Sequence, residues 1–295
     1  MRDTHVFTSY ILWVLGTAAL VPIGCRGEST SETKDGKGID TADRLLEIAP
    51  LKEVSGPFGT INALAFSEDG RYLLSGPGVF MPGVQVFPIR KWDSESMTEV
   101  AKLEGHKRGI ICLDVLHSSG LLASASFDDT LRVWDVAENR EIGFIHISPA
   151  NESASIACLK FSPTGDALIS GGGEVDGKNL SIWDWKEKKL LKRILCEGRP
   201  NCLALANKGN RIVVGGEQGA RPNIRPFLAL VDLDTGEAIR NFASSGRDIT
   251  SVAVSPDGQM LIAGDSRGLL EFYRLQDGGL LRIKKGHKKR VEDIC

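Results

Sequence analysis

The chain has 295 residues, of which 42% are hydrophobic and 25% are charged, and its formal net charge is -2 at pH 7. This composition indicates a globular protein, and the small negative charge gives no overall attraction for nucleic acid. The six cysteines form no C-x-x-C pair and have no histidine at zinc-site spacing. We therefore expect no metal centre, no cofactor and no nucleic-acid partner.

The first residues of the chain have the character of an export signal. Residues 6–24 are almost entirely apolar or small, which predicts a signal peptide over residues 1–24. Cys25 follows Gly24 in a sequence similar to the lipobox of bacterial lipoproteins, except that Pro22 stands where that pattern usually has leucine. The resemblance implies lipid attachment at Cys25. The alternatives are a plain signal peptide or a retained anchor, for which the apolar run is at the short limit. We expect an extracytoplasmic protein, membrane-anchored or periplasmic, that contacts the membrane only through this signal or lipid.

The rest of the chain divides into a tether and one repetitive domain. Residues 25–43 are rich in Ser, Thr, Gly and charged residues, which predicts a flexible tether. Over residues 44–295, a unit of about 45 residues recurs. Its landmark is a small polar turn that ends in glycine, at Gly70, Gly120, Gly165, Gly209 and Gly258. Each unit has four short segments with a period of two, which is the content of one propeller blade. We expect an all-β domain with five complete repeats.

The second copy shows the plan of the unit most clearly. We expect its strands at residues 110–115, 121–126, 131–136 and 141–147. The third strand recurs in the other copies, and the register places one residue of each copy at the same position: Phe87, Trp134, Trp183, Val231 and Tyr273. In this register, Trp92 and Asp93 follow the third strand of the first copy and do not belong to the recurring motif.

Two dipeptides of the second copy carry a family resemblance. Gly105 and His106 open the copy, and Trp134 and Asp135 close its third strand. They resemble the WD-repeat β-propeller family, and the resemblance covers about residues 44–295. It implies a β-propeller built from four-stranded blades.

The resemblance also implies a structural tetrad. In this family, His, Ser or Thr, Asp and Trp side chains tie a blade together by hydrogen bonds, and here the tetrad falls on His106, Ser124, Asp128 and Trp134. We interpret it as a device for stability and not as an acid–base pair. The other copies are degraded, since Arg267 stands at the Asp position of the fifth copy.

The two ends of the repeat array suggest an interrupted ring. Leu45–Val54 resembles the fourth strand of a blade, and residues 286–295 align with residues 105–114, which open the second copy and run into its first strand. Five blades plus the first strand of a sixth predict a truncated six- or seven-bladed propeller. Closing it needs roughly 25 more residues for six blades or about 70 for seven. The alternative is that five blades close imperfectly.

The cysteines of the repeats have a structural explanation. Cys112, Cys158 and Cys202 share one position on the first strand, where a small buried side chain fits. Cys196 and Cys202 flank a short loop, so oxidation to a disulfide in an exported protein is the alternative to two free thiols.

No catalytic motif stands out, so we expect no enzymatic activity and a non-catalytic scaffold for protein–protein interaction. In WD-repeat propellers, the loops from strand four to strand one and from strand two to strand three form a common partner-binding face. The alternative for this chain is that its loop charges only maintain solubility. A further alternative is a propeller domain of an exported enzyme whose catalytic part is absent from this chain. We expect an acidic protein or peptide partner at these loop residues: Phe80, Lys107, Arg108, Phe127, Arg199, Arg247, Lys288 and Arg290.

Overall fold

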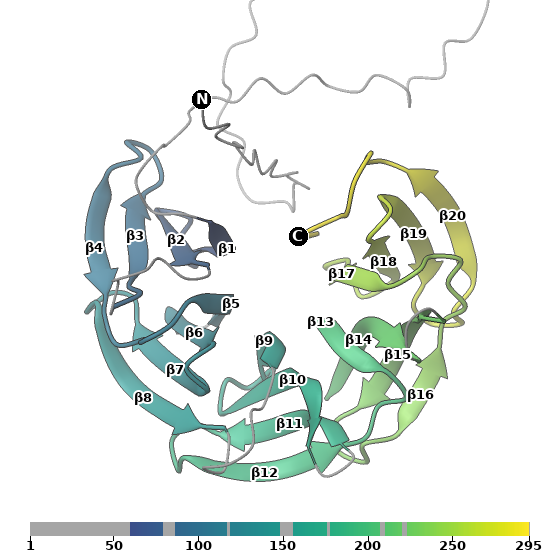
Figure 1. The fold of residues 1–295 in the computed structure, drawn as a ribbon, viewed down its shortest axis with the longest axis horizontal. Helices are drawn as coiled ribbons and strands as arrows, with labels where there is room; N and C mark the ends of the chain where they lie inside the picture. Colours follow the sequence, from purple (N-terminus) through teal and green to yellow (C-terminus); the bar gives the residue numbers. More distant parts are fainter. Residues whose placement is uncertain are drawn as a thin grey trace, which may run out of the picture.

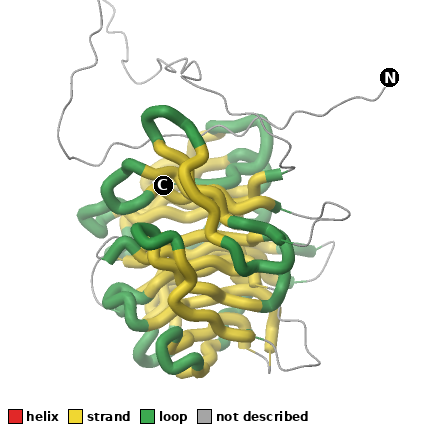
Figure 2. The backbone as a smooth tube through the Cα atoms, turned by 90° about the vertical axis from the view of Figure 1, so that its left-hand side faces the viewer, coloured by secondary structure: helices red, strands yellow, loops and turns green. Residues whose placement is uncertain are grey.

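The computed structural model of the protein describes residues 60–78, 86–116, 119–147, 156–175, 178–206, 210–219 and 223–294. These residues form strands, turns and loops (Figure 2), and they contain no helix long and apolar enough to cross a membrane. The predicted signal peptide, the tether, the segment Leu45–Val54, Cys25 and Phe80 lie outside the described residues.

The described strands form five antiparallel four-stranded sheets, each made of consecutive strands, which we call blades 1 to 5. Blade 1 comprises β1 (Ile61–Phe66), β2 (Tyr72–Pro77), β3 (Ile89–Asp93) and β4 (Glu99–Leu103). Blade 2 comprises β5 (Ile110–Leu116), β6 (Leu121–Ser126), β7 (Thr130–Asp135) and β8 (Arg140–His146). Blade 3 comprises β9 (Ile156–Phe161), β10 (Ala167–Val175), β11 (Lys178–Asp184) and β12 (Lys189–Ile194). Blade 4 comprises β13 (Arg199–Ala206), β14 (Arg211–Gln218), β15 (Arg225–Asp232) and β16 (Ala238–Asn241). Blade 5 comprises β17 (Ile249–Val254), β18 (Met260–Asp265), β19 (Leu269–Arg274) and β20 (Leu280–Lys285).

The blades lie side by side in an arc around a common centre (Figure 1). The first strand of each blade is nearest the centre, and the fourth strand lies on the circumference. The described part of the arc is open between blade 5 and blade 1 (Figure 1). The prediction of an all-β propeller with five complete four-stranded repeats is confirmed.

The glycine landmark of the repeat lies in the turn between the first and second strands. Gly70, Gly165 and Gly258 have φ of 69°, 75° and 67°. A side chain is unfavourable in this left-handed region, so the turn selects glycine at each repeat.

Hydrophobic cores join neighbouring blades. Between blades 2 and 3, Leu131 and Val133 from one sheet pack with Phe161 and Trp183 from the next. Equivalent clusters join blades 1 and 2, blades 3 and 4, and blades 4 and 5. Because side chains alternate between the two faces of a strand, each inner blade packs one face on the blade before it and the other face on the blade after it.

The third strand of blade 1 differs from the sequence prediction. In β3, Trp92 pairs with Leu73, as Trp134 pairs with Leu122 in blade 2. Trp92 therefore holds the recurring position, and its assignment to Phe87 was wrong. The connector from β2 to β3 covers residues 78–88, whereas the connector from β6 to β7 covers only 127–129. The sequence prediction assumed a constant repeat period. Because the β2–β3 connector is longer than that period allows, the prediction placed the third strand of blade 1 too early.

Residues 286–294 follow β20 and lie against the inner strands of blade 5. The Val291 amide donates to the carbonyl of Asp265 at 3.1 Å, and Thr250 Oγ1 donates to the Val291 carbonyl at 2.6 Å. Val291 is 5% exposed and lies directly over Gly264. These contacts fasten the segment to blade 5.

The same contacts occur where one blade meets the next. Asn62 donates to the carbonyl of Ile110 at 3.1 Å, and Asn201 donates to that of Ile249 at 3.3 Å, each at the start of the next blade's first strand. Val291 thus occupies the place that Ile110 occupies in blade 2, as the alignment of residues 286–295 predicted. The described part of this segment, however, forms no strand.

Candidate functional site

The tetrad residues of blade 2 form one chain of hydrogen bonds. Trp134 Nε1 donates to Ser124 Oγ at 2.8 Å, and Ser124 Oγ lies 2.7 Å from His106 Nε2. His106 Nδ1 lies 2.9 Å from Asp128 Oδ2. Since the Ser124 hydroxyl accepts from the indole, its own hydrogen is directed to Nε2, which places the imidazole proton on Nδ1. The chain links β6, β7 and the two connectors beside them.

Burial keeps this imidazole neutral. His106 is 1% exposed, and burial lowers its pKa even though Asp128 acts in the opposite direction. Burial by itself would raise the pKa of Asp128. Hydrogen bonds from His106, Thr130 and the Lys107 amide outweigh that effect and hold the pKa of Asp128 well below its usual range. A neutral, enclosed histidine with both nitrogens engaged is suited to holding connectors in place.

The indole–hydroxyl pair of the tetrad recurs in two other blades. Trp92 Nε1 donates to Ser75 Oγ at 2.8 Å in blade 1, and Trp183 Nε1 donates to Ser170 Oγ at 2.9 Å in blade 3. These pairs join the second and third strands at the same register as in blade 2. Blades 1 to 3 therefore retain this pair, although other positions of the repeat motif have changed.

Blade 5 replaces the tetrad with a buried carboxylate. Glu271 is 2% exposed and accepts a hydrogen bond of 2.8 Å from the hydroxyl of Tyr273, which stands at the tryptophan position. The connector before β17 adds the Ser244 hydroxyl and both the amide and the hydroxyl of Ser245. Burial, together with Glu271, raises the pKa of Tyr273. This network was not predicted, because the repeat register indicates only that Trp and Asp are lost from blade 5.

The cysteines of the inner strands are free thiols. Cys112, Cys158 and Cys202 occupy one register position, each following the bulge of its first strand, as predicted. Cys196 is also free, so the structure contains no Cys196–Cys202 disulfide. Burial raises the pKa of both Cys112 and Cys196 to about 12, which keeps these thiols protonated at neutral pH.

The candidate partner-binding residues lie at one end of the blades. Connectors from fourth to first strands and from second to third strands emerge at the same end, because consecutive strands are antiparallel. We call this end the connector face. The described candidates on it are all exposed: Lys107, Arg108, Phe127, Arg199, Arg247, Lys288 and Arg290.

Contacts place two of these residues side by side in blade 2, and they add a further cation, Arg267, in blade 5. In blade 2, Arg108 Nη1 donates to the carbonyl of Phe127 at 3.3 Å, and the Phe127 side chain is 44% exposed. In blade 5, Arg267 Nη2 donates to the carbonyl of Ser245, and the residues before Arg290 pass over the backbone of Gly268. Cations therefore lie on the connector face at both blade 2 and blade 5.

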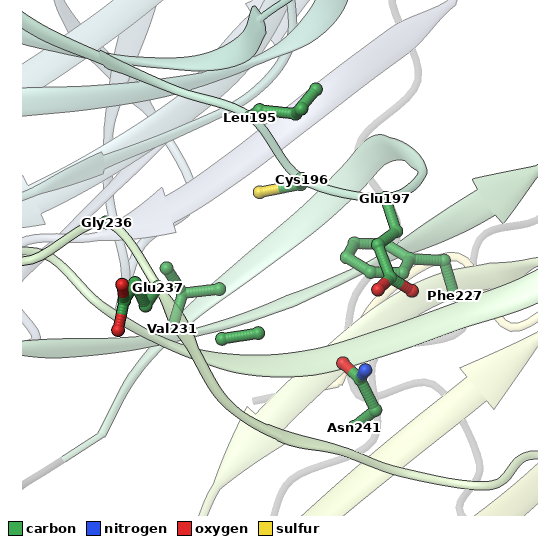
Figure 3. A pocket seen from close by; sticks show the side chains of 9 residues that line it. Leu195, Cys196, Glu197, Phe227, Val231, Gly236, Glu237 and Asn241 are labelled. Carbon is green, nitrogen blue, oxygen red and sulfur yellow. The ribbon is translucent and has the colours of Figure 1, made fainter.

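A pocket that the sequence analysis did not predict lies between blades 3 and 4. It encloses about 240 Å³ (Figure 3). Residues from the β12–β13 connector, from β15 and from the start and end of β16 line it: Leu195, Cys196, Glu197, Phe227, Val231, Gly236, Glu237, Ala238 and Asn241. The sequence feature that indicates this pocket is Val231, which stands at the tryptophan position of the repeat. The described residues hold no cluster of three or more side chains suited to a metal ion.

Comparison with protein families matches four segments of the chain to the model described as "WD domain, G-beta repeat", at residues 48–78, 97–135, 144–184 and 236–270. The last three of these segments each begin in or just before the fourth strand of one blade and end in the third strand of the next. The chain belongs to the WD-repeat family. The matched WD repeats leave out residues 185–235, which include Val231 and five of the nine residues that line the pocket.

Two curated plant proteins are similar to most of the chain. Protein ROOT INITIATION DEFECTIVE 3 of Arabidopsis thaliana is 26% identical over 231 residues, which are 75% of this chain and 50% of that protein. Autophagy-related protein 16 of the same plant is 25% identical over 244 residues, which are 80% of this chain and 43% of that protein. The chain spans about half the length of the curated relatives it matches.

A solved structure supports the propeller fold. A chain in the crystal structure of the Mitotic Checkpoint Complex superposes with a TM-score of 0.64 at 20% sequence identity, over 81% of this chain and 69% of that chain. At this identity, the likeness concerns the fold alone.

Proposed function

We propose that this WD-repeat chain is a non-catalytic scaffold whose connector face binds an acidic protein or peptide. The observation that supports the proposal most is the pairing of Arg108 with exposed Phe127 in blade 2. An apolar anchor bordered by cations is the usual anatomy of a site for an acidic, partly apolar segment. WD-repeat proteins act widely as interaction scaffolds, which agrees with this assignment.

The Asp128 carboxylate beside this site is directed away from the exposed cations. Asp128 lies beside Lys107 and Arg108, but its side chain is 7% exposed and accepts hydrogen bonds from His106 and from the Lys107 amide. Its carboxylate is therefore directed into the blade. The ammonium and guanidinium groups of Lys107 and Arg108 remain exposed to a partner.

The cations of blade 5 extend the surface. Arg247 is exposed and makes no ion pair within the described residues. Arg267 is 55% exposed and lies 3.5 Å from the buried Asp265. Lys288 and Arg290 follow on the segment after β20. An extended acidic segment that reaches both blades would contact cations at each end, which favours a peptide-like partner over a compact anion.

A binding measurement with matched charge reversals tests this proposal. The probe is a fluorescent peptide of alternating Glu and Leu, and its anisotropy is followed at low and at physiological salt. We expect Arg108→Glu with Arg247→Glu to weaken binding about tenfold or more. The control pair, Arg140→Glu with Lys189→Glu, reverses exposed charges at the opposite end of the blades and should leave binding unchanged. Equal losses in both pairs, or no binding by the unaltered protein, would overturn the proposal.

We also propose that the scaffold is exported and held at a membrane through Cys25. The support is the apolar run before Cys25 and the lipobox-like residues around it, which lie outside the described structure. Expression of the full chain in bacteria with labelled palmitate should give a labelled protein that partitions with membranes. Cys25→Ser should remove the label. Labelled-palmitate incorporation equal in both proteins, or absent from both, would exclude a lipid at this residue.

A further inference from the structure

The pocket between blades 3 and 4 exists because blade 4 lacks the large side chains of the repeat motif. Val231 stands where Trp134 stands in blade 2, and Val214 stands where Ser124 stands. Pro200 holds the register position of Ile110, and Cys196 precedes Pro200 by four residues, as His106 precedes Ile110. The indole and imidazole that fill this region of blade 2 are thus replaced by much smaller groups. The space they leave remains as a pocket of about 240 Å³.

The floor of the pocket is apolar and neutral. Phe227, Val231 and Cys196 are 5%, 3% and 6% exposed. Burial raises the pKa of the Cys196 thiol to about 12, so the thiol carries no charge at neutral pH. Such a floor binds an apolar or aromatic group and provides little for a charged one.

The rim of the pocket is exposed and acidic. Leu195 is 64% exposed, and Glu197, Glu237 and Asn241 are exposed as well. Glu197 and Asn241 lie at the end near Phe227, and Glu237 lies at the end near Val231 (Figure 3). Neither carboxylate makes an ion pair in the described part of the chain.

The Lys192 ammonium lies near the rim. The Lys192 side chain comes close to Gly236, and its ammonium is held by the carbonyls of Leu233 and Asp234 at 3.3 and 2.6 Å. It is therefore directed to the β15–β16 turn. The charged residues among those that line the pocket are the two carboxylates of Glu197 and Glu237.

The connector that carries part of the rim is fixed in position. Asn179 Nδ2 donates to the carbonyls of Cys196 and Gly198 at 3.0 and 2.6 Å, and the Cys196 amide donates back to Asn179 Oδ1 at 2.8 Å. Gly198 in turn packs on the side chain of Phe227, because a Cβ at Gly198 would come within 2.7 Å of that ring. A preformed site binds at a lower entropic cost than one that must order first.

We propose that this pocket binds a tryptophan side chain of a partner peptide that has basic residues on either side of the tryptophan. Tryptophan is the residue that fills the equivalent space in blades 1 to 3, and the Glu197 carboxylate and the Asn241 amide oxygen supply acceptors for its N–H. Glu197 and Glu237, one toward each end of the pocket, suit one basic residue each. The pocket shares the β12–β13 connector with the connector face, but none of the candidate cations lines it, so the proposal does not rest on the acidic partner.

The test uses short capped peptides and the full chain, with binding followed by the fluorescence of an attached dye. The unaltered protein should bind Lys-Trp-Lys at least about tenfold more tightly than Lys-Ala-Lys or Glu-Trp-Glu. Val231→Trp combined with Val214→Ser rebuilds the indole–hydroxyl pair of the other blades and should abolish binding while the melting temperature is unchanged or higher. Ala238→Trp, at the exposed mouth, should block binding without altering the core, which covers the case in which the double variant fails to fold.

A charge variant tests the rim separately. Glu197→Gln with Glu237→Gln should reduce the preference for Lys-Trp-Lys over Glu-Trp-Glu by about tenfold. Glu138→Gln, at an exposed turn of blade 2, is the matched control and should keep the preference. The proposal is overturned if the unaltered protein does not discriminate between the peptides, or if either filled variant binds Lys-Trp-Lys as the unaltered protein does.

Discussion

The hydroxyl of Thr250 donates a hydrogen bond of 2.6 Å to the carbonyl oxygen of Val291. This bond attaches the segment after β20 to the first strand of blade 5, at the place where Asn62 and Asn201 join other blades. The isosteric change Thr250→Val removes the donor and leaves the Val291 carbonyl without it.

We expect Thr250→Val to loosen this segment more than the blade. Hydrogen–deuterium exchange of a peptide covering residues 286–294 should become faster, because the Val291 amide is protected by its bond to Asp265. The global free energy of unfolding should fall by only about 1 kcal/mol. Peptides from blade 2 serve as the internal control, and faster exchange there as well would indicate a general loss of stability.

The buried Glu271 carboxylate of blade 5 should contribute more to the free energy of unfolding than an exposed carboxylate does. Glu271→Gln replaces one of the two acceptor oxygens with an NH₂ group, which then faces either the donors of Tyr273 and Ser244 or those of Ser245. We expect the free energy of unfolding to fall by about 2 kcal/mol in urea titrations. Glu138→Gln should change it by less than about 0.5 kcal/mol. An unchanged urea midpoint for Glu271→Gln would show that the network adds no stability.

The tryptophans of blades 1 and 2 make the same bond in different surroundings. Trp134→Phe removes the indole donor from the enclosed tetrad, whereas Trp92→Phe removes it from a half-buried site with no described blade before it. We expect Trp134→Phe to lower the free energy of unfolding by about 2 kcal/mol, and Trp92→Phe to lower it less, because the half-buried Trp92 side chain loses less packing. Denaturant titration of the two variants decides the order, and the reverse order would contradict this explanation.

His106 should make stability depend on pH below neutrality. Its pKa is lowered in the folded protein by burial, so between pH 6.5 and the folded pKa the unfolded chain binds the extra proton. Stability should therefore fall as the pH drops below about 6.5, with a slope of at most about 1.4 kcal/mol per pH unit from this group. Asp128 acts in a lower window, since its depressed pKa gives stability that is lost only as the pH falls below the usual carboxyl range.

Urea titrations between pH 7.5 and 5 test this dependence. His106→Gln should be less stable at pH 7.5 but should lose less stability on acidification than the unaltered protein. His146→Gln changes an exposed histidine on β8 and should retain the full dependence. If all three proteins show the same slope, the tetrad histidine is not its source.

The local features of the repeat could be predicted from the sequence. The glycine turns depend on a φ value that few other residues adopt, and the alternation along strands depends on the two faces of a sheet. The tetrad of blade 2 could also be assigned, because its four residues keep the spacing of the family motif. The equivalence of Val291 with Ile110 could be predicted in the same way, from a local match between residues 286–295 and residues 105–114.

The structure corrected the points that depend on connector length or on contacts between distant residues. Trp92 was assigned wrongly because the β2–β3 connector is longer than its counterparts. The Glu271 network joins residues more than twenty positions apart, and the cavity above Val231 is bounded by β12–β13 and β15–β16. The sequence by itself determined the repeating strand plan, since that plan rests on interactions within one unit of about 45 residues. Only the tertiary structure decided which degraded positions are filled and which are empty, because that depends on how neighbouring blades pack against each other.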